Sequence, residues 1–446
     1  MKGDIAHVVS RCGYVAYRGK VLPMEDAKES VSSVVDEMLQ DGMKVIAVAQ
    51  KNVGQQNQIN PADEADMILV GYLAFFDAPK KTAKMSIEAL KRLKVTPKIL
   101  TGDQTDVAVS ICRRVGIPSE TVLTGAELDE MTDSELSAAV ERAHVFSELT
   151  PGQKVRLVSA LEQNGHTVGF LGDGINDIPA LCEANVGISV DTAVDAAKDA
   201  ADVVLLQKDL GVLEQGILEG RKTFTNMLKY IKITASSNFG NILSIVCASA
   251  FLPFLPMTAL QLLLLNLLYD VLCIILPWDN VDEEETLSPR DWSGKTLGRF
   301  MLSFGPISSL FDIATFLFLY YVLCPMLCGG MTYLHLTDPA LQLQYVALFQ
   351  TGWFLESMWT QVLILHFLRT RKIPFLQSRP SAPVMCTTLT GIALFTGITF
   401  TKAASLFGLT ELPHWYFGFL LIVALLYMLL TTVVKAFYQE KYRELI

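Results

Sequence analysis

The chain has 446 residues, of which 51% are hydrophobic and 18% are charged, and its mean hydropathy is +0.36. A chain of this length and apolar content is too long for one small domain and too hydrophobic to lie wholly in water. The formal net charge of −10, with no cluster of lysines and arginines among aromatic residues, argues against nucleic acid as a partner.

Hydrophobic residues are unevenly distributed along the chain. From Met1 to about Lys232, charged and apolar residues mix in short periodic runs. From Ile233 onward, apolar stretches of about twenty residues follow one another, which is the length that crosses a bilayer. We therefore expect a soluble first half followed by a membrane half.

The soluble half alternates apolar strand patterns with amphipathic helix patterns. The expected strands are 42–50, 67–77, 95–100, 166–174 and 186–190, and the expected helices are 80–94, 151–165 and 176–185. This alternation predicts an α/β fold with a mostly parallel sheet, which binds ligands at the carboxyl ends of its strands.

Polar residues suited to phosphoryl chemistry stand at such strand ends or at helix starts. Thr101 offers a hydroxyl and Lys154 an ammonium that can neutralise phosphoryl oxygens. Asp173 and Asp177 offer carboxylates for Mg²⁺, and the GDG run at 172–174 permits a tight turn. Taken alone, Thr101 could be a turn residue, Lys154 a surface charge on a helix, and Asp177 an acid at the start of a helix. Their order and spacing together predict a phosphoryl site.

Six apolar segments of the second half are candidate membrane spans: Ile233–Leu255, Met257–Leu276, Phe304–Leu323, Leu343–Leu368, Val384–Leu406 and Trp415–Phe437. Most of the lysines and arginines between these spans fall on one side, whereas the three opposite loops offer only Lys402. The positive-inside rule therefore places the soluble half and the C-terminus in the cytosol.

Polar side chains inside the first two spans form a candidate cation path. Asn238 and Asn241 lie in the first span, and Asn266 and Asp270 lie four residues apart in the second. Facing each other, they would make an all-oxygen site for a hard cation; the alternative is hydrogen bonding between helices. Glu356 in the fourth span either lines the same path or bonds to a neighbour.

Several motifs resemble one known family. The segments "TGD", "TPGQK", "GDGINDIPAL" and "GRKTFTNMLKYIK" resemble the hinge-to-membrane region of the P-type cation-transporting ATPases, whose phosphorylation domain has the haloacid-dehalogenase-like fold. "KGDIAHVVSRC" is similar to a segment of their nucleotide domain. "DAPKK", from Asp77, occupies the hinge position, with Ala78 where a second proline is common. The resemblance covers essentially the whole chain.

Within the family, "SSNFGN", "NLLYDVLCIILPWDNVD" and "FQTGWFLESMW" look most like the magnesium-transporting ATPases. This implies an ATP-driven Mg²⁺ importer of the plasma (inner) membrane. Asn238, Asn241, Asn266, Asp270 and Glu356 would then be candidate ligands of the transported ion. The alternatives are another cation, Ca²⁺ or H⁺, or a non-catalytic half-pump that binds a partner chain.

The resemblance also implies roles in the soluble half. Lys2 and Gly3 would line the ATP pocket, and Asp173 would hold the catalytic Mg²⁺ with support from Asn176 and Asp177. The phosphoryl and nucleotide site would comprise Thr101, Gly102, Asp103, Lys154, Asp173, Asn176 and Asp177.

The implied domains are the C-terminal part of a nucleotide-binding domain (1–76), the C-terminal part of an α/β haloacid-dehalogenase-like phosphorylation domain (77–217), a stalk helix (218–232), an α-helical bundle of six transmembrane helices (233–437) and a cytoplasmic tail (438–446). The family's phosphate acceptor, the aspartate of a DKTGT stretch, is missing from these 446 residues. We therefore expect the chain to be the C-terminal half of a pump and to be inactive without an N-terminal half. We also expect Met1 to be an artificial or incomplete boundary rather than the genuine start of the protein.

Overall fold

The computed structural model describes residues 1–40, 43–52, 64–75 and 79–445. The chain divides into two compact units, Met1–Ile217 and Leu218–Ile446. Asp77 and Ala78, at the expected hinge, lie outside the described residues.

The first unit begins with a five-stranded sheet in the order β1-β4-β5-β2-β3. Its elements are β1 (Lys2–Asp4), α1 (Ile5–Val9), β2 (Cys12–Tyr17), β3 (Lys20–Pro23), α2 (Lys28–Gln40), β4 (Lys44–Gln50) and β5 (Met67–Phe75). All its pairs are antiparallel except β2–β5. Val8, Cys12, Ala47 and Leu69 form part of its buried core. The strands expected at 42–50 and 67–77 are confirmed over Lys44–Gln50 and Met67–Phe75, whereas residues 42, 76 and 77 lie outside the described part of the chain.

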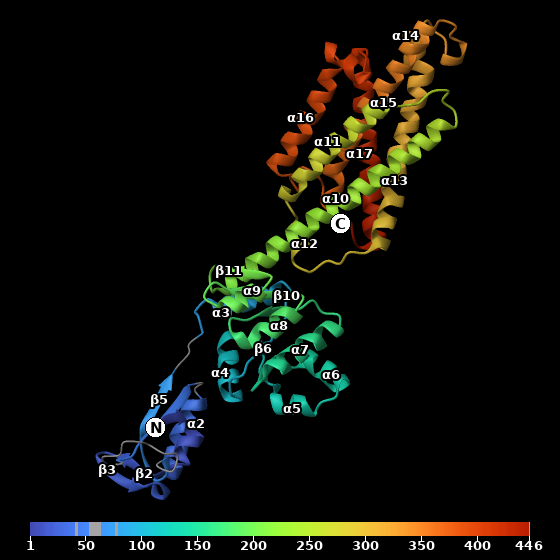
Figure 1. Ribbon diagram of the computed structural model, residues 1–446. Helices are drawn as coiled ribbons and strands as arrows, with labels where there is room; N and C mark the ends of the chain where they lie inside the picture. Colours follow the sequence, from blue (N-terminus) through green and yellow to red (C-terminus); the bar gives the residue numbers. More distant parts are fainter. Residues whose placement is uncertain (41–42, 53–63, 76–78, 446) are drawn as a thin grey trace. The chain divides into compact units, whose positions relative to one another are not determined.

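The rest of the first unit is an α/β arrangement with two parallel sheets, in the orders β6-β8-β7 and β11-β10-β9 (Figure 1). The strands are β6 (Ile99–Leu100), β7 (Val122–Thr124), β8 (Val145–Ser147), β9 (Gly169–Leu171), β10 (Val186–Val190) and β11 (Val203–Leu205). The helices are α3 (Ala83–Arg92), α4 (Thr105–Val115), α5 (Gly125–Glu130), α6 (Asp133–Arg142), α7 (Pro151–Gln163), α8 (Ile178–Glu183) and α9 (Asp195–Ala200). Leu100 and Val168 pack against the cores of both sheets.

Two predicted strands are shorter than the sequence pattern indicates. The strand expected at 95–100 contains only the two residues of β6, which are half-buried rather than buried, and the strand expected at 166–174 contains only β9. Pro97 has no N–H for a sheet hydrogen bond, and the chain turns after Leu171 into a glycine-containing loop. Both strands still end where the candidate site begins.

The second unit is helical. Its elements are α10 (Leu210–Ser249), which begins in the first unit, α11 (Ala259–Ile275), α12 (Glu283–Thr286), α13 (Gly294–Phe318), α14 (Cys324–Leu327), α15 (Pro339–Leu368), α16 (Ala382–Ile398) and α17 (His414–Tyr442). The stalk and the first expected span form the single helix α10, which ends at Ser249 rather than at Leu255.

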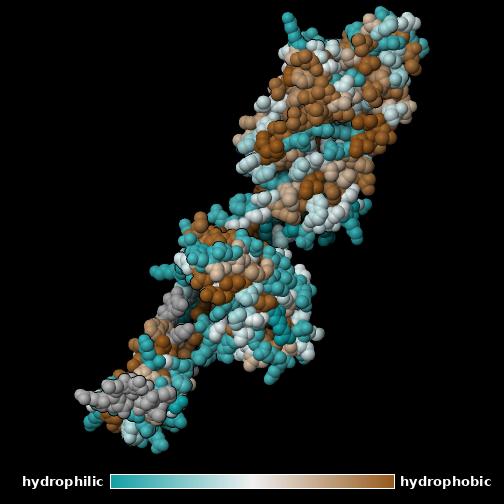
Figure 2. Space-filling model, in the orientation of Figure 1, coloured by the Kyte–Doolittle hydropathy of each residue, from teal (hydrophilic) through white to brown (hydrophobic). Residues whose placement is uncertain are grey.

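In the described part of the chain, three helical segments are long and apolar enough to cross a membrane: Ala259–Trp278, Gly294–Leu327 and His414–Tyr442. Figure 2 shows hydrophobic residues over much of the visible face of this unit. The number of six spans is not confirmed, although α10, α15 and the shorter apolar helix α16 occupy the other three expected segments. The protein is thus a membrane protein with at least three candidate spans.

All eight cysteines are unpaired, and Cys324 and Cys328 are buried in the apolar core of the helical unit. Burial also raises the pKa of Cys112 to about 11, whereas Cys182 lies at the surface. We expect a maleimide at pH 8 to modify Cys182 rapidly and to leave Cys112 intact, because only about 10⁻³ of a thiol with that pKa is thiolate. Peptide mass spectrometry would locate the label. Fast labelling of Cys112 in the folded chain would contradict the assignment.

Candidate functional site

The candidate site is built from two loops that follow parallel strands. Residues 101–103 follow β6, and residues 172–174 follow β9. Helix α7 begins beside them at Thr150, whose side chain accepts a hydrogen bond from the N–H of Gln153, while Gln153 Oε1 accepts from the N–H of Thr150. This capping box, with Pro151 at the first helical position, fixes the start of the helix that carries Lys154.

Lys154 and Asp177 form an ion pair, with 2.7 Å between Nζ and Oδ1. Their side chains are only 12% and 16% exposed, so water screens the pair less than at the open surface. Gly172 makes this geometry possible, since a Cβ at this position would lie 2.5 Å from Cβ of Asp177. The N–H of Gly174 donates to Oδ2 of Asp177 at 3.4 Å.

Asp173 differs from Asp177 in being half-exposed. Its Oδ2 lies 2.8 Å from Nζ of Lys208, and the two side chains are 52% and 55% exposed. An exposed ion pair contributes little stability, so a divalent cation can take the place of Lys208. Sequence reasoning missed Lys208, which follows β11 in a segment without a recognisable motif.

The loop at 101–103 is fixed by local hydrogen bonds. Oγ1 of Thr101 donates to Oδ2 of Asp103 at 3.1 Å and accepts from the N–H of Asp103 at 3.1 Å. The N–H groups of Glu148 and Leu149 donate to the carbonyls of Asp103 and Thr101, both at 3.0 Å. The loop is therefore tied to the segment just before α7, which brings Thr101 and Gly102 to the end of the helix that carries Lys154.

The other predicted residues of the soluble half lie as follows. Asn176 is exposed in the 3-10 turn Ile175–Asp177. Lys2 and Gly3 lie on β1, an edge strand of the five-stranded sheet, with Lys2 exposed. Their predicted contact with ATP stays a prediction.

The four amide and carboxylate side chains expected to line the cation path are not joined to one another by hydrogen bonds in the described structure. Asn238, Asn266 and Asp270 are exposed on the surface of the helical unit. Asn241 instead accepts a hydrogen bond from Nε2 of Gln361 at 2.8 Å. Among the described residues, no three Asp, Glu, His or Cys side chains form a metal-binding group. The ion-ligand set stays a proposal.

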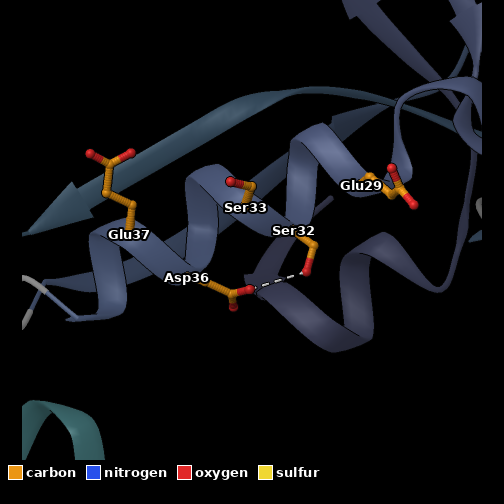
Figure 3. A pocket seen from close by; sticks show the side chains of 5 residues that line it. All are labelled: Glu29, Ser32, Ser33, Asp36 and Glu37. Carbon is orange, nitrogen blue, oxygen red and sulfur yellow. Dashed lines mark hydrogen bonds between the residues drawn. The ribbon is translucent and has the colours of Figure 1, made fainter.

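A shallow hollow along α2 is lined by five exposed side chains: Glu29, Ser32, Ser33, Asp36 and Glu37 (Figure 3). Oγ of Ser32 donates to Oδ2 of Asp36 at 3.3 Å, which is an ordinary contact one turn apart on a solvated helix face. We assign no function to this hollow.

Comparison with known proteins matches both units to described families. Residues 13–185 match the haloacid dehalogenase-like hydrolases, and residues 254–437 match the C-terminus of the cation transporting ATPases. The chain is 46% identical over 443 residues to "Magnesium-transporting ATPase, P-type 1" of Salmonella typhimurium and 45% identical over 443 residues to the protein of that name in Escherichia coli K12. The chain belongs to the P-type cation-transporting ATPases.

The match to these P-type ATPases covers 99% of this chain but 48% of each of the two relatives, so the chain spans about half their length. A more distant relative, "Calcium-transporting ATPase 1" of Bacillus cereus, is 32% identical over 275 residues. The chain is thus more similar to these two proteins, which are named as magnesium transporters, than to this calcium transporter, and it corresponds to their C-terminal half.

Proposed function

We propose that the chain forms the C-terminal half of an ATP-driven Mg²⁺ transporter of the plasma membrane that works through a phosphorylated intermediate. The observation that carries this proposal is the Lys154–Asp177 ion pair beside the half-exposed Asp173 at the carboxyl end of β9. A cation and two carboxylates at strand ends are suited to phosphoryl transfer. The magnesium transporters among the relatives support Mg²⁺ as the transported ion.

Each site residue has a role that follows from its chemistry. Lys154 neutralises phosphoryl oxygens, and Thr101, Gly102 and Asp103 lie against the phosphate groups of ATP. Asp173 and Asp177 fit a catalytic Mg²⁺, because the described side chains offer Asp173 only the exposed Lys208 as an ion-pair partner, and Asp177 lies four residues further along the chain, in the 3-10 turn Ile175–Asp177. When bound, Mg²⁺ supplies positive charge beside the phosphoryl group.

Strand pairing supports the proposal that the phosphorylated aspartate lies on a segment outside these 446 residues. Among the described strands, β6 pairs only with β8, and β9 pairs only with β10, so each is an edge strand that leads directly into the site. One further parallel strand between them would join the two sheets into one, with its carboxyl end beside Lys154 and Asp173. We infer that the strand carrying the phosphorylated aspartate occupies this position.

Helix α10 supports coupling between the site and the membrane. It is continuous over 40 residues, from Leu210 in the first unit to Ser249, and passes Asn238 and Asn241. A rigid helix of this length transmits a rotation of the phosphorylation domain to the ion path. The soluble parts and the C-terminus would face the cytosol.

The test compares the chain alone with the chain co-expressed with the N-terminal half of the E. coli relative. We expect the chain alone to show no vanadate-sensitive ATP hydrolysis, and the co-expressed pair to support Mg²⁺ uptake in cells that lack other Mg²⁺ transporters. Asp173→Asn should lower that uptake by about 10²–10³-fold, whereas Asp195→Asn, at a 93% exposed side chain on α9, should not.

Two outcomes would contradict the proposal. Vanadate-sensitive turnover by the chain alone would show that it needs no external acceptor. Uptake of Ca²⁺ in preference to Mg²⁺ by the assembled protein would overturn the proposed ion.

A further inference from the structure

Two carboxyl groups meet inside the helical unit. The side chains of Asp312, on α13, and Glu356, on α15, lie within hydrogen-bonding range of each other. The residues are only 3% and 1% exposed. Burial of two acids in one place is costly unless hydrogen bonds or a cation compensate their charge.

Asp312 is contacted from two neighbouring helices. Oγ of Ser244, on α10, lies 2.6 Å from Oδ2 of Asp312, and Nε1 of Trp353, on α15, donates to Oδ1 at 2.8 Å. One turn from Ser244, the Asn241–Gln361 hydrogen bond also joins α10 to α15. Asp312 therefore stands where three helices converge.

The backbones of α10 and α13 are in close contact near this point. A Cβ at Gly240 would lie 2.8 Å from the carbonyl oxygen of Gly305, and a Cβ at Gly305 would lie 3.1 Å from that of Ser236. Helices this close have little freedom to move relative to each other. The acid pair therefore lies beside a tightly packed contact between α10 and α13.

Among the described residues, two buried oxygens near the pair have no hydrogen-bond partner, Oε2 of Glu356 and Oγ1 of Thr315. The hydroxyl of Ser357 lies within hydrogen-bonding range of Asp312. Ser357 follows Glu356 directly, and Thr315 lies one turn after Asp312. Buried polar atoms in folded proteins almost always have partners. Carboxylate and hydroxyl oxygens are the ligands that hard divalent cations prefer, and two carboxylates balance two positive charges.

We propose that Asp312 and Glu356, with the hydroxyls of Ser357 and Thr315, bind a divalent cation of the Mg²⁺ class within the helical unit. The inference rests on the proposed function as a cation transporter. It adds Asp312, which sequence reasoning did not single out, and gives Glu356 a partner other than the exposed Asp270.

Trp353 provides a reporter for this site, because its indole N–H contacts Asp312. In the purified full chain in nanodiscs, we expect Mg²⁺ to cause a saturable change in tryptophan fluorescence that Trp353→Phe removes. Asp312→Asn and Glu356→Gln should each weaken Mg²⁺ binding at least tenfold. Mn²⁺ binding followed by electron paramagnetic resonance checks that Trp353→Phe removes the reporter and not the site.

Controls separate this inference from the proposed function. Asp270→Asn should leave the Trp353 signal unchanged, and Ser357→Ala, a mild change, should weaken binding in a chain whose melting temperature without Mg²⁺ is unaltered. Wild-type binding by both acid variants would overturn the inference, as would the lack of any saturable Mg²⁺ signal. Loss of Mg²⁺ binding in Asp270→Asn alone would overturn it too, while leaving the proposed cation path intact.

Discussion

Replacing Asp279 by alanine should lower the free energy of unfolding of the helical unit by about 3–5 kcal/mol, because two buried cations lose their shared anion. Oδ2 of Asp279 lies 3.0 Å from Nζ of Lys229 and 2.9 Å from Nη1 of Arg369. The side chains of all three residues are at most 2% exposed. Thermal unfolding in detergent, followed by circular dichroism, measures the loss.

The effect is large because Asp279 joins three segments. Lys229 comes from α10 and Arg369 from the end of α15, and the N–H of Ser381, before α16, donates to Oδ1 of Asp279 at 3.1 Å. Removing the carboxylate leaves like charges side by side at low dielectric. Removing Arg369 instead leaves the Lys229–Asp279 pair in place, so Arg369→Met should cost less.

The loss from Asp279→Ala should shrink as the pH rises. Burial lowers the pKa of Lys229 below its ordinary value of 10.5, and the charge of Asp279 opposes that shift. Without Asp279, the pKa of Lys229 in the folded chain falls further. The unfolded chain then binds more protons than the folded chain over a wider pH range below 10.5. Stability then rises with pH in this range. A loss that is equal near pH 7 and near pH 9.5 would contradict this account.

A matched control is the exposed pair Lys222–Glu219 on the same helix, at 2.8 Å with side chains 45% and 61% exposed. Lys222→Ala should change stability by no more than about 0.5 kcal/mol. A similar loss from Lys222→Ala and Asp279→Ala would show that burial of the charge network is not the cause.

Local patterns were enough to predict the elements of the phosphoryl-type site but not all of its contacts. The order of strands and helices predicts that Thr101, Lys154 and Asp173 lie at strand ends or helix starts, and the structure brings the Thr101 loop to the start of α7. Sequence reasoning did not predict the ion pair between Lys154 and Asp177, which joins α7 to the loop after β9. The lengths of β6 and β9 were overestimated, because apolar runs do not show where proline or glycine interrupts strand pairing.

The contacts that sequence reasoning missed join residues far apart in the chain. Lys208 pairs with Asp173 over 35 residues, and Asp279 pairs with Lys229 over 50 and with Arg369 over 90. Helical periodicity relates residues only within a few turns of one another. The Asp279 pairs depend on how α10 and α15 pack around the segment after α11, and the Lys208–Asp173 pair depends on how the segment after β11 lies against the loop after β9. Spacing along the sequence determines neither arrangement.

Gly172→Ala should reduce the rate of phosphoenzyme formation in the co-expressed protein by about 10²-fold, because displacing a catalytic group by about 1 Å has an effect of this size. The added Cβ would lie 2.5 Å from Cβ of Asp177 and 3.0 Å from its Oδ2. Asp177 has to move, and its 2.7 Å contact with Lys154 is lost. Incorporation of phosphate from labelled ATP measures the rate.

Gly174→Ala is the matched control two residues away. The nearest atom to a Cβ at Gly174 is Oδ2 of Asp177 at 3.8 Å, an ordinary contact, and its φ of −109° suits any residue. We expect a rate within about twofold of wild type, because the N–H that bonds Asp177 is kept. If both variants lost activity equally, the rate of phosphoenzyme formation would depend on the flexibility of the loop rather than on the space beside Asp177. If only Gly172→Ala loses it, the rate depends on the position of Asp177 against Lys154.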